Sequence, residues 1–493
     1  MRSLFVAACA MALAQPVHAQ VRDSTTSGPV LSLEEAITLA QRNNPQHQQS
    51  MTARQRAGAA LRSAYGALFP SLSSNFNTSY REGRPQIFNG VEFGANTDVI
   101  SSSASLSLQA QWSGASILFP KQQRASLDAA EADISSSEVS LRNTIATQYL
   151  TALQAQARAD LQDTLVVTAE AQLELARARE SVGSATSLDV RRAEVQLGQQ
   201  QVSRIRERNS AQIELLRLFQ QMGVPQPENA RLSTTFPVTE PTYELDDLLD
   251  QARRGNPQLH ALEARSRVAD VAVTRSRMSY IPTLSISTGL SGFTQQQQDI
   301  NGVITGEQQS ALRSRASCFT QDSLRQGAGL PGITGQCNAI VFTPADADRI
   351  RSFNDKYPFD FTRNPLSFSV QLSLPIWDGF GREENIQQAT AARRDADLNV
   401  RQQQLALTAD VTTAYLNLQA AYAAVQIQER NSVAARDAQT LAQERFRVGA
   451  GTFIDVQQAR ADYELAETDR INAIYDFHKA VAALEAAVGR PLR

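Results

Sequence analysis

The sequence repeats itself once, and this duplication limits the possible folds more than any other feature. Two blocks align without gaps, residues 33–72 with 245–284 at an offset of 212, and residues 145–225 with 411–491 at an offset of 266. The second offset is larger by 54 residues, and almost all of the extra residues fall between 292 and 365. The sequence therefore predicts a first structural repeat over residues 20–242 and a second over residues 243–493, with an enlarged loop at 292–365.

Each repeat predicts the same order of elements: a short helix after an Asn-Pro pair, two extended segments, one very long helix, a glycine-containing turn and a returning helix. The long helices cover about 66 residues, near 116–181 and 380–447, and the returning helices about 35 residues, ending at Gly223 and Gly489. These stretches are rich in Ala, Gln, Arg and Glu and nearly free of Pro and Gly, a composition that favours helix.

The apolar residues of the long helices recur at alternating spacings of three and four. Val411, Tyr415, Leu418, Tyr422 and Val425 are an example. This narrow seam is typical of a coiled coil, although an ordinary helical bundle fits the spacing about equally well. Length separates the two interpretations, because a helix of this size is ~100 Å long, far beyond a globular diameter. We therefore predict a long, thin helical body.

The extended segments alternate between apolar and polar residues, as strands with one apolar and one polar face do. Four segments show the pattern: residues 72–80, 101–112, 284–291 and 366–376. One interpretation is a half-buried sheet packed on a core. The other is a transmembrane β-barrel whose apolar face meets lipid and whose polar face lines a water-filled lumen. Four strands cannot close a barrel, so the second interpretation requires three copies and twelve strands.

Three features point to a known family: the Asn-Pro pairs, the strand pairs and two turns, Arg179…Val182-Gly183…Thr186…Asp189-Val190 and Arg445…Val448-Gly449…Thr452…Asp455-Val456. They carry a resemblance to the TolC family of outer-membrane efflux proteins, which extends from residue 31 to residue 492. It implies a mainly α fold with a β-barrel part: a TolC-like α-helical barrel plus four strands per chain in a trimeric 12-stranded transmembrane β-barrel. The implied location is the cell outer membrane, with the helices extending into the periplasm.

The implied function is that of an exit duct of a tripartite efflux pump or type I secretion system, which passively conducts substrates from the periplasm to the outside. The partners implied are a homotrimer, outer-membrane lipid, a periplasmic adaptor (membrane fusion) protein and, through it, an inner-membrane pump. A soluble periplasmic coiled-coil adaptor or scaffold is the alternative, but it would not need four amphipathic strands. The near-neutral formal net charge of −3 gives no basic footprint, so nucleic acid is not an expected partner.

The resemblance places Val182, Gly183, Val448 and Gly449 at the periplasmic tip, where they would dock the adaptor. It also implies a gate on the neighbouring residues. Asp189 and Asp455 match acidic gate positions, Phe446 matches an aromatic position without the hydroxyl, and Gly451 stands where the family's best-known gate has an arginine. That latch is therefore not carried over, and we expect apolar contacts around Phe446 and Phe453 in its place.

The two aspartates have two interpretations. Each follows a turn at a predicted helix start, so it could serve as a helix cap. Alternatively, six carboxylates in a trimer would form two rings that attract cations, giving a cation-preferring pore that divalent cations block from the periplasmic side.

Residues 1–19 have a positive start, a short apolar core and small residues before position 20, which predicts a signal peptide. Cys9 only loosely matches a lipoprotein cleavage box, and it lies too early. Cys318 and Cys337 are the cysteines that remain after cleavage, and an outward-facing loop in an oxidising compartment favours a disulfide between them. The sequence shows no catalytic, cofactor-binding or metal-binding constellation, so we expect no enzyme activity, no cofactor and no metal.

Overall fold

A computed structural model of the protein describes residues 30–83, 86–88, 91–93 and 97–492. The predicted signal peptide and Cys9 lie outside the described residues. The chain forms two compact units. The helical unit comprises residues up to Thr52, Ala132–His260 and Gln402 onwards, and the sheet unit comprises Ala53–Glu131 and Ala261–Arg401. Within the described part of the chain, no helix is both long and apolar enough to cross a membrane.

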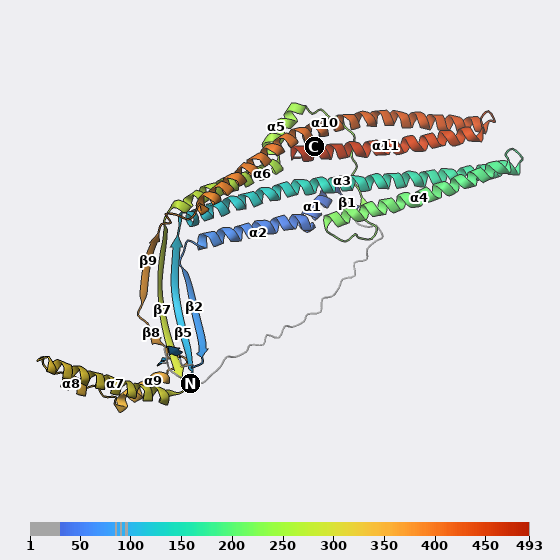
Figure 1. Ribbon diagram of the computed structural model, residues 1–493. Helices are drawn as coiled ribbons and strands as arrows, with labels where there is room; N and C mark the ends of the chain where they lie inside the picture. Colours follow the sequence, from blue (N-terminus) through green and yellow to red (C-terminus); the bar gives the residue numbers. More distant parts are fainter. Residues whose placement is uncertain (1–29, 84–85, 89–90, 94–96, 493) are drawn as a thin grey trace, which may run out of the picture. The chain divides into compact units, whose positions relative to one another are not determined.

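The long helices occur where the sequence predicts them (Figure 1). The helical unit contains α1 (Leu33–Asn43), α4 (Ser187–Met222), α5 (Leu245–Gly255), α11 (Phe453–Val488) and the short parallel pair β1 (Val30–Leu31) and β6 (Arg231–Leu232). Four further helices contribute to both units: α2 (Pro45–Gly66), α3 (Gly114–Ser181), α6 (Pro257–Arg277) and α10 (Gly381–Arg447). In the helical unit α3 pairs with α4, and α10 with α11, as two hairpins.

The Asn-Pro pairs have a clear structural use in the helical unit. The Asn44 side chain donates to the carbonyl oxygen of Gln221 at 2.7 Å and accepts from the His47 N–H, so it ties the start of α2 to the end of α4. Asn256 repeats this arrangement, donating to the Ala487 carbonyl oxygen at 3.0 Å. The adjacent Gly223 ends α4 at φ +77°, and a Cβ there would lie 2.4 Å from the Asn43 carbonyl oxygen. Only glycine fits that approach.

Two short helices, α1 and α5, precede the Asn-Pro pairs and were not predicted from the sequence. Ser32 and Glu35 form a capping box at the start of α1. Ala36, Ile37 and Ala40 of α1 are buried against α3 and α4, in a cluster that includes Leu141, Ile145, Tyr149, Leu218, Phe219 and Met222. The Tyr149 hydroxyl donates to the Leu31 carbonyl oxygen at 2.8 Å. Packing on α3 and α4 therefore makes α1 stable at a length that is marginal for an isolated helix.

The sheet unit holds a four-stranded antiparallel sheet in the order β2 (Ser71–Arg81), β5 (Val99–Trp112), β7 (Thr283–Gln297) and β9 (Ser367–Ser373) (Figure 1). A two-residue strand, β8 (Thr362–Arg363), pairs with β7 beyond β9, β3 (Gln86–Phe88) pairs with β4 (Val91–Phe93), and a 3-10 turn covers Met278–Tyr280. The predicted combination of long helices and four strands is thus confirmed.

The sheet register puts polar residues opposite polar residues. Ser73 lies opposite Ser107, and Ser287 opposite Ser369, with hydroxyl oxygens 2.7 Å apart in both pairs. The other face carries exposed apolar side chains: Leu72, Phe76, Leu106, Leu108, Leu290, Phe368, Val370 and Leu372. Because successive strand residues point to opposite faces, the period-two pattern of the sequence becomes one hydroxyl-rich face and one apolar face.

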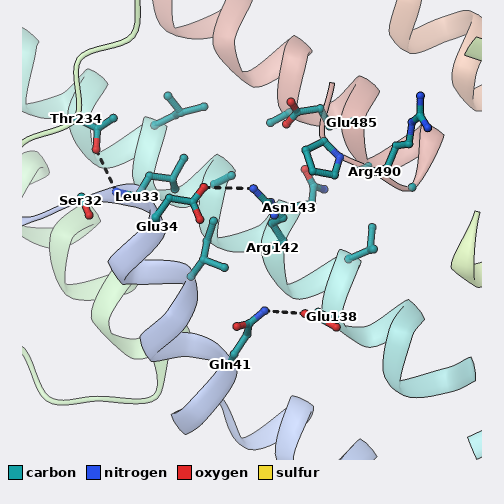
Figure 2. A pocket seen from close by; sticks show the side chains of 18 of the residues that line it. Ser32, Leu33, Glu34, Gln41, Glu138, Arg142, Asn143, Thr234, Glu485 and Arg490 are labelled. Atoms are coloured by element: carbon teal, nitrogen blue, oxygen red, sulfur yellow. Dashed lines mark hydrogen bonds and ion pairs between the residues drawn. The ribbon is translucent and has the colours of Figure 1, made fainter. Parts of the chain in front are cut away.

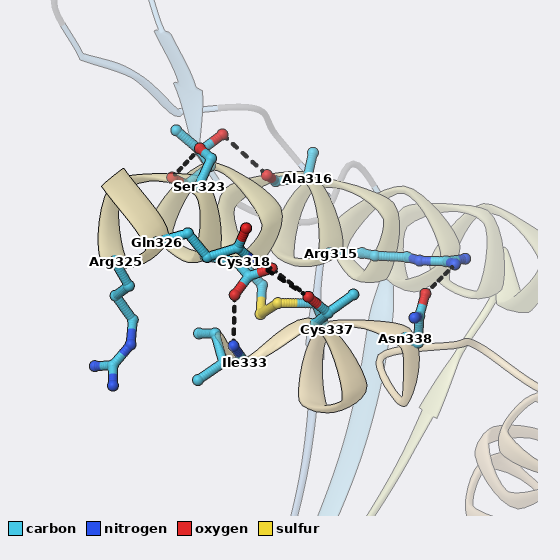
Figure 3. Close-up of a disulfide and its surroundings, with 12 residues drawn as sticks. Arg315, Ala316, Cys318, Ser323, Arg325, Gln326, Ile333, Cys337 and Asn338 are labelled. Carbon is cyan, nitrogen blue, oxygen red and sulfur yellow. Dashed lines mark hydrogen bonds between the residues drawn. A yellow bond between two sulfur atoms is a disulfide. The ribbon is translucent and has the colours of Figure 1, made fainter. Parts of the chain in front are cut away.

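The enlarged loop is shorter than predicted and largely helical. β7 continues to Gln297, because Thr294–Gln297 pair with Val99–Ser102 of β5. Residues 294–297 are all polar, so they do not show the apolar–polar alternation by which the sequence predicts a strand. The connection contains α7 (Ile300–Gly327), α8 (Thr334–Asn338) and α9 (Pro344–Asn354). A Cys318–Cys337 disulfide joins α8 to α7, with the two Cα atoms 5.4 Å apart (Figure 3). The buried Asp322 carboxylate accepts hydrogen bonds from the Ile333 N–H and the Thr334 hydroxyl beside it.

Candidate functional site

The turns between paired helices are built by glycine in the left-handed conformation. Gly183 follows α3 at φ +74°; its N–H donates to the Glu180 carbonyl oxygen, and the Ser184 N–H donates to that of Arg179. Gly449 closes α10 in the same way at φ +77°. This pair of hydrogen bonds is the Schellman motif, which requires a residue that tolerates positive φ. Val182 and Val448 stand beside these glycines with 77% and 70% of their surface exposed.

The predicted gate aspartates lie one turn into the following helices. Asp189 is the third helical residue of α4, where its carboxylate accepts from the Thr186 N–H at 3.1 Å and from the Thr186 hydroxyl at 2.8 Å. Asp455 does the same with Thr452 on α11, at 2.9 and 2.8 Å. In each case the threonine is the N-cap residue and the aspartate completes a capping box. The sequence had suggested the aspartates themselves as caps.

These hydrogen bonds stabilise the charged form of both carboxylates. The pKa of Asp189 is lowered, chiefly by the Thr186 hydroxyl and then by the Thr186 N–H. The pKa of Asp455 is also lowered, chiefly by the Thr452 N–H and then by its hydroxyl. Both groups are therefore anionic at neutral pH, and each stands at a helix N-terminus, where the helix dipole favours negative charge.

Phe446 links the turn region of the second repeat to that of the first. The Arg179 guanidinium carbon lies 4.6 Å from the centre of the Phe446 ring, and the Arg179 side chain also donates to the Arg447 carbonyl oxygen at 3.4 Å. Phe446 packs edge-on against Phe453, with ring centres 6.0 Å apart. At Gly451 a Cβ would lie 3.2 Å from the Arg445 Cβ, so this position has little room for a side chain. The Arg179 contact is a cation–π interaction that the sequence did not predict.

A shallow groove of about 460 Å³ lies between α4 and α11 beside the turns. It is lined by Leu188, Arg191, Arg192, Val195, Gln196, Gln199, Phe453, Ile454 and Gln457. Leu188, Val195 and Ile454 are largely exposed, whereas Phe453 packs against the buried cluster of Leu173, Ala176, Val190 and Ala193. The tips thus combine exposed apolar side chains, several arginines and two anionic carboxylates.

A second cavity, of about 450 Å³, lies between α1, α3 and the end of α11 (Figure 2). Several of its polar side chains bond to each other: Gln41 donates to Glu138 at 2.8 Å, and Arg142 donates to Glu34 at 3.2 Å. Thr234 accepts from the Leu33 N–H at 3.0 Å. This cavity lies where the two repeats meet, and we assign it no ligand.

Residues 36–224 and 344–490 match one family model, whose description is outer membrane efflux protein. The two matched stretches together make up more than half of the chain. The chain belongs to the outer membrane efflux protein family. A search of curated proteins with this sequence finds no match.

Solved structures show the same fold. The outer membrane protein VceC of Vibrio cholerae is 15% identical, with a TM-score of 0.67 over 94% of this chain and 97% of that one. The CmeC outer membrane channel of Campylobacter jejuni is 12% identical, with a TM-score of 0.68 over 95% and 90%. The MtrE outer membrane channel of Neisseria gonorrhoeae, solved in its open state, is 16% identical, with a TM-score of 0.65 over 94% and 89%. Identities this low show the fold alone.

The resemblance to the TolC family is thereby confirmed, and this efflux protein is a duct of the outer membrane. Its family is one of channels rather than enzymes. The family assignment favours the duct over the soluble periplasmic scaffold that the helices alone would also fit. Its candidate functional site consists of the two capped turns and the residues beside them. The site comprises Val182, Gly183, Val448, Gly449, Asp189, Asp455, Phe446 and Gly451.

Proposed function

We propose that three copies of this chain form an exit duct that passively conducts substrates from the periplasm to the outside, as part of a tripartite efflux pump or a type I secretion system. The observation that carries the proposal is the sheet, whose edge strand β2 and opposite edge β9 have no further partner strand in the described chain. Open edges cannot lie in hydrocarbon, because unpaired N–H and C=O groups are costly there. Joining β2 of one copy to β9 of the next removes both edges.

The exposed apolar face supports the same assembly. Leu72, Phe368 and Leu372 are each about two-thirds exposed, at 66%, 67% and 70%. In a closed barrel this face meets outer-membrane lipid, and the hydroxyl-rich face lines the lumen. Three copies of a four-stranded sheet give twelve strands, an even number within the range of bacterial barrels.

Exposed apolar side chains along the helices also fit a trimer. In the helical unit they follow α4 (Leu188, Val195, Val202, Ile205, Ile213 and Leu216) and α10 (Leu405, Leu416, Ile427, Val433 and Leu441). These stripes extend over about 42 and about 54 Å at 1.5 Å per residue. Packing α10 of one copy along α4 of the next would cover both stripes. Such a head-to-tail contact closes into a ring when repeated three times.

We assign docking and charge selection to the tips. Val182, Gly183, Val448 and Gly449 form exposed apolar ends suited to a periplasmic adaptor protein, which would connect the duct to an inner-membrane pump. Asp189 and Asp455 would present six carboxylates in the trimer and favour cations.

Cross-linking in native outer membranes tests the assembly, with a three-subunit product expected. The purified trimer should then form conducting pores in planar lipid bilayers. A chain that is extracted without detergent as a stable monomer, and that forms no pores, would contradict the proposal.

A further inference from the structure

The contact between α3 and α11 joins the two repeats inside the helical unit, and we call it the repeat seam. Polar side chains follow it over several turns. Gln162 of α3 donates to Glu464 at 3.3 Å, Arg158 of α3 donates through Nε to Asn472 at 2.9 Å, and Lys479 donates to Gln154 at 2.6 Å. A coiled-coil contact is ordinarily apolar at such positions. The repeat seam therefore has a polar centre.

Arg460 is the most unusual member of the repeat seam. Only 1% of its surface is exposed, and it is the largest fully buried side chain among the described residues. Its Nη2 donates to the Leu165 carbonyl oxygen at 2.8 Å and its Nη1 to Gln172 Oε1 at 2.9 Å. Both acceptors are uncharged. Within the described chain no carboxylate lies within 4.0 Å of the guanidinium, and its Nε has no acceptor.

The environment of Arg460 opposes its charge. Burial lowers the pKa of Arg460, and only the more distant Glu464 acts in the opposite direction. A buried charge without an ionic partner loses much of its hydration without regaining it from the protein. Nearby, Gln162 of α3 and Gln200 of α4 both donate to Glu464, and each keeps a buried carbonyl oxygen without a partner in the described chain. The repeat seam thus has unsatisfied polar groups around Arg460.

The fold itself does not require an arginine here. The equivalent position of the first repeat, 266 residues earlier, is Glu194. Glu194 is partly exposed and pairs with Arg177 at 3.0 Å and with Arg191 at 2.8 Å. The same helix position therefore holds a partly exposed carboxylate with two ion pairs in one repeat and a buried guanidinium without an ion pair in the described chain in the other.

We infer that Arg460 is a positioning residue that sets the balance between a joined and a separated repeat seam, and through it the opening of the duct. Separation of α11 from α3 rehydrates the guanidinium, so the charge favours the separated state. The two hairpins contact each other along the repeat seam and through Arg179 at the tips, so a looser repeat seam gives them more freedom to move relative to one another. This inference rests on the proposed duct function.

Two substitutions should strengthen the repeat seam by different physical routes. Arg460→Met removes the buried charge and keeps an apolar side chain of similar length. Gln172→Glu instead places a carboxylate where Nη1 already donates, and so gives Arg460 an ionic partner. Arg206→Met is the matched control, because it removes the same charge from an exposed position on α4.

Single-channel recordings of purified trimers in planar lipid bilayers test the inference. Arg460→Met and Gln172→Glu should each lower the open probability by about tenfold, within the range seen when a buried charge is replaced or paired. Arg206→Met should match the wild type. If Arg460→Met does not fold, the open probability of Gln172→Glu alone tests the inference.

Thermal melting separates gating from simple stability. Unchanged open probability in folded trimers of both variants, even with a raised melting temperature, would show that Arg460 affects folding only and would overturn the inference. A higher open probability in Arg460→Met would also overturn it, by showing that the arginine holds the repeat seam together. Failure of the wild type to form pores would contradict the proposed function and this inference with it.

Discussion

The geometry of the tip carboxylates is compatible with both roles that the sequence presents as alternatives. In the capping boxes of Asp189 and Asp455, the Oδ2 oxygen accepts from the threonine N–H and hydroxyl. This hydrogen bonding lowers the pKa of each group and so maintains its negative charge. Capping and charge selection are therefore compatible, and experiments must separate them.

The first prediction separates charge from capping. In Asp189→Asn and Asp455→Asn the amide oxygen can still accept the threonine hydrogen bonds, but the charge is lost. We expect weaker cation preference and weaker block by periplasmic divalent cations in planar-bilayer recordings. Thr186→Ala and Thr452→Ala are the matched controls: they keep the charge and lose a cap, typically worth about 1 kcal/mol. If the threonine variants alter ion selectivity while the asparagine variants do not, the carboxylates serve only the helix starts.

The second prediction concerns pH. The pKa values of Asp189 and Asp455 in the folded protein lie below their ordinary values. Their charged forms therefore stabilise the folded state fully above the unfolded pKa of about 3.9, and this stabilisation is lost as the pH falls through the folded pKa values. Cation preference should therefore stay constant from about pH 8 to about pH 5 and decline only in stronger acid. Reversal potentials measured across this range check it. A decline near neutral pH would point instead to a carboxyl with a raised pKa, such as Asp160.

Single residues show where sequence reasoning succeeds and where it stops. The Val-Gly turns can be recognised in the sequence because a positive φ angle limits the choice of residue. Arg179 and Arg460 are not, because an arginine in a helical sequence does not reveal whether it meets solvent, the Phe446 ring or a backbone carbonyl. The only available signal for Arg460 was its position four residues after the buried Val456, on the apolar face of α11.

At the scale of elements, the sequence predicts the strongly periodic segments well and misses the elements that depend on contacts with distant parts of the chain. The predicted long helix at 116–181 is observed as Gly114–Ser181. By contrast, α1 depends on packing against α3 and α4, and the last residues of β7 depend on pairing with β5. Neither kind of tertiary support leaves a periodic pattern in the sequence. The capping box of Ser32 and Glu35 is the local signal that marks the start of α1. The helices of the enlarged connection are likewise held by a disulfide and by hydrogen bonds to Asp322.

The third prediction concerns this connection. Replacing Cys318 and Cys337 by serine removes a link between residues 19 apart, worth about 3 kcal/mol in the chain-entropy description. We expect α8 to detach locally while the sheet stays intact, since α8 touches α7 rather than the strands. Limited proteolysis of membrane-embedded protein should then cut between 328 and 343 much faster than in the wild type. Ser323→Ala, on the exposed side of α7, should leave the rate unchanged. Equal rates in all three proteins would show that the hydrogen bonds of Asp322 and Arg315 are enough to hold α8 on α7.

At the scale of the whole molecule, the two repeats keep the same backbone plan but differ in chemistry. Both have a Schellman turn, a capping box and an asparagine that ties two helices together. Among the described residues, only the second has a buried arginine, the aromatic pair Phe446 and Phe453 at its tip, and the helical connection. In a trimer, the backbones of the six hairpins would therefore follow roughly six-fold symmetry, whereas their side chains would repeat only three times around the duct. The shared plan was predictable from the sequence offset, whereas these differences become apparent only from contacts.

The last prediction concerns which face of the sheet meets lipid. Val370 and Gln371 are neighbours on β9 and point to opposite faces, opposite Ile286 and Ser285 of β7 respectively. If the apolar face lies in the bilayer, Val370→Asp buries a carboxylate in hydrocarbon at a cost of up to about 2 kcal/mol per copy, paid three times in a trimer. Gln371→Asp adds a ring of carboxylates to a water-filled lumen and should assemble normally with stronger cation preference. The amount of trimer in the outer membrane and the reversal potential of reconstituted pores measure the two effects. If Gln371→Asp blocks assembly and Val370→Asp does not, the apolar face packs against protein, and the half-buried sheet is the correct interpretation of the alternating strands.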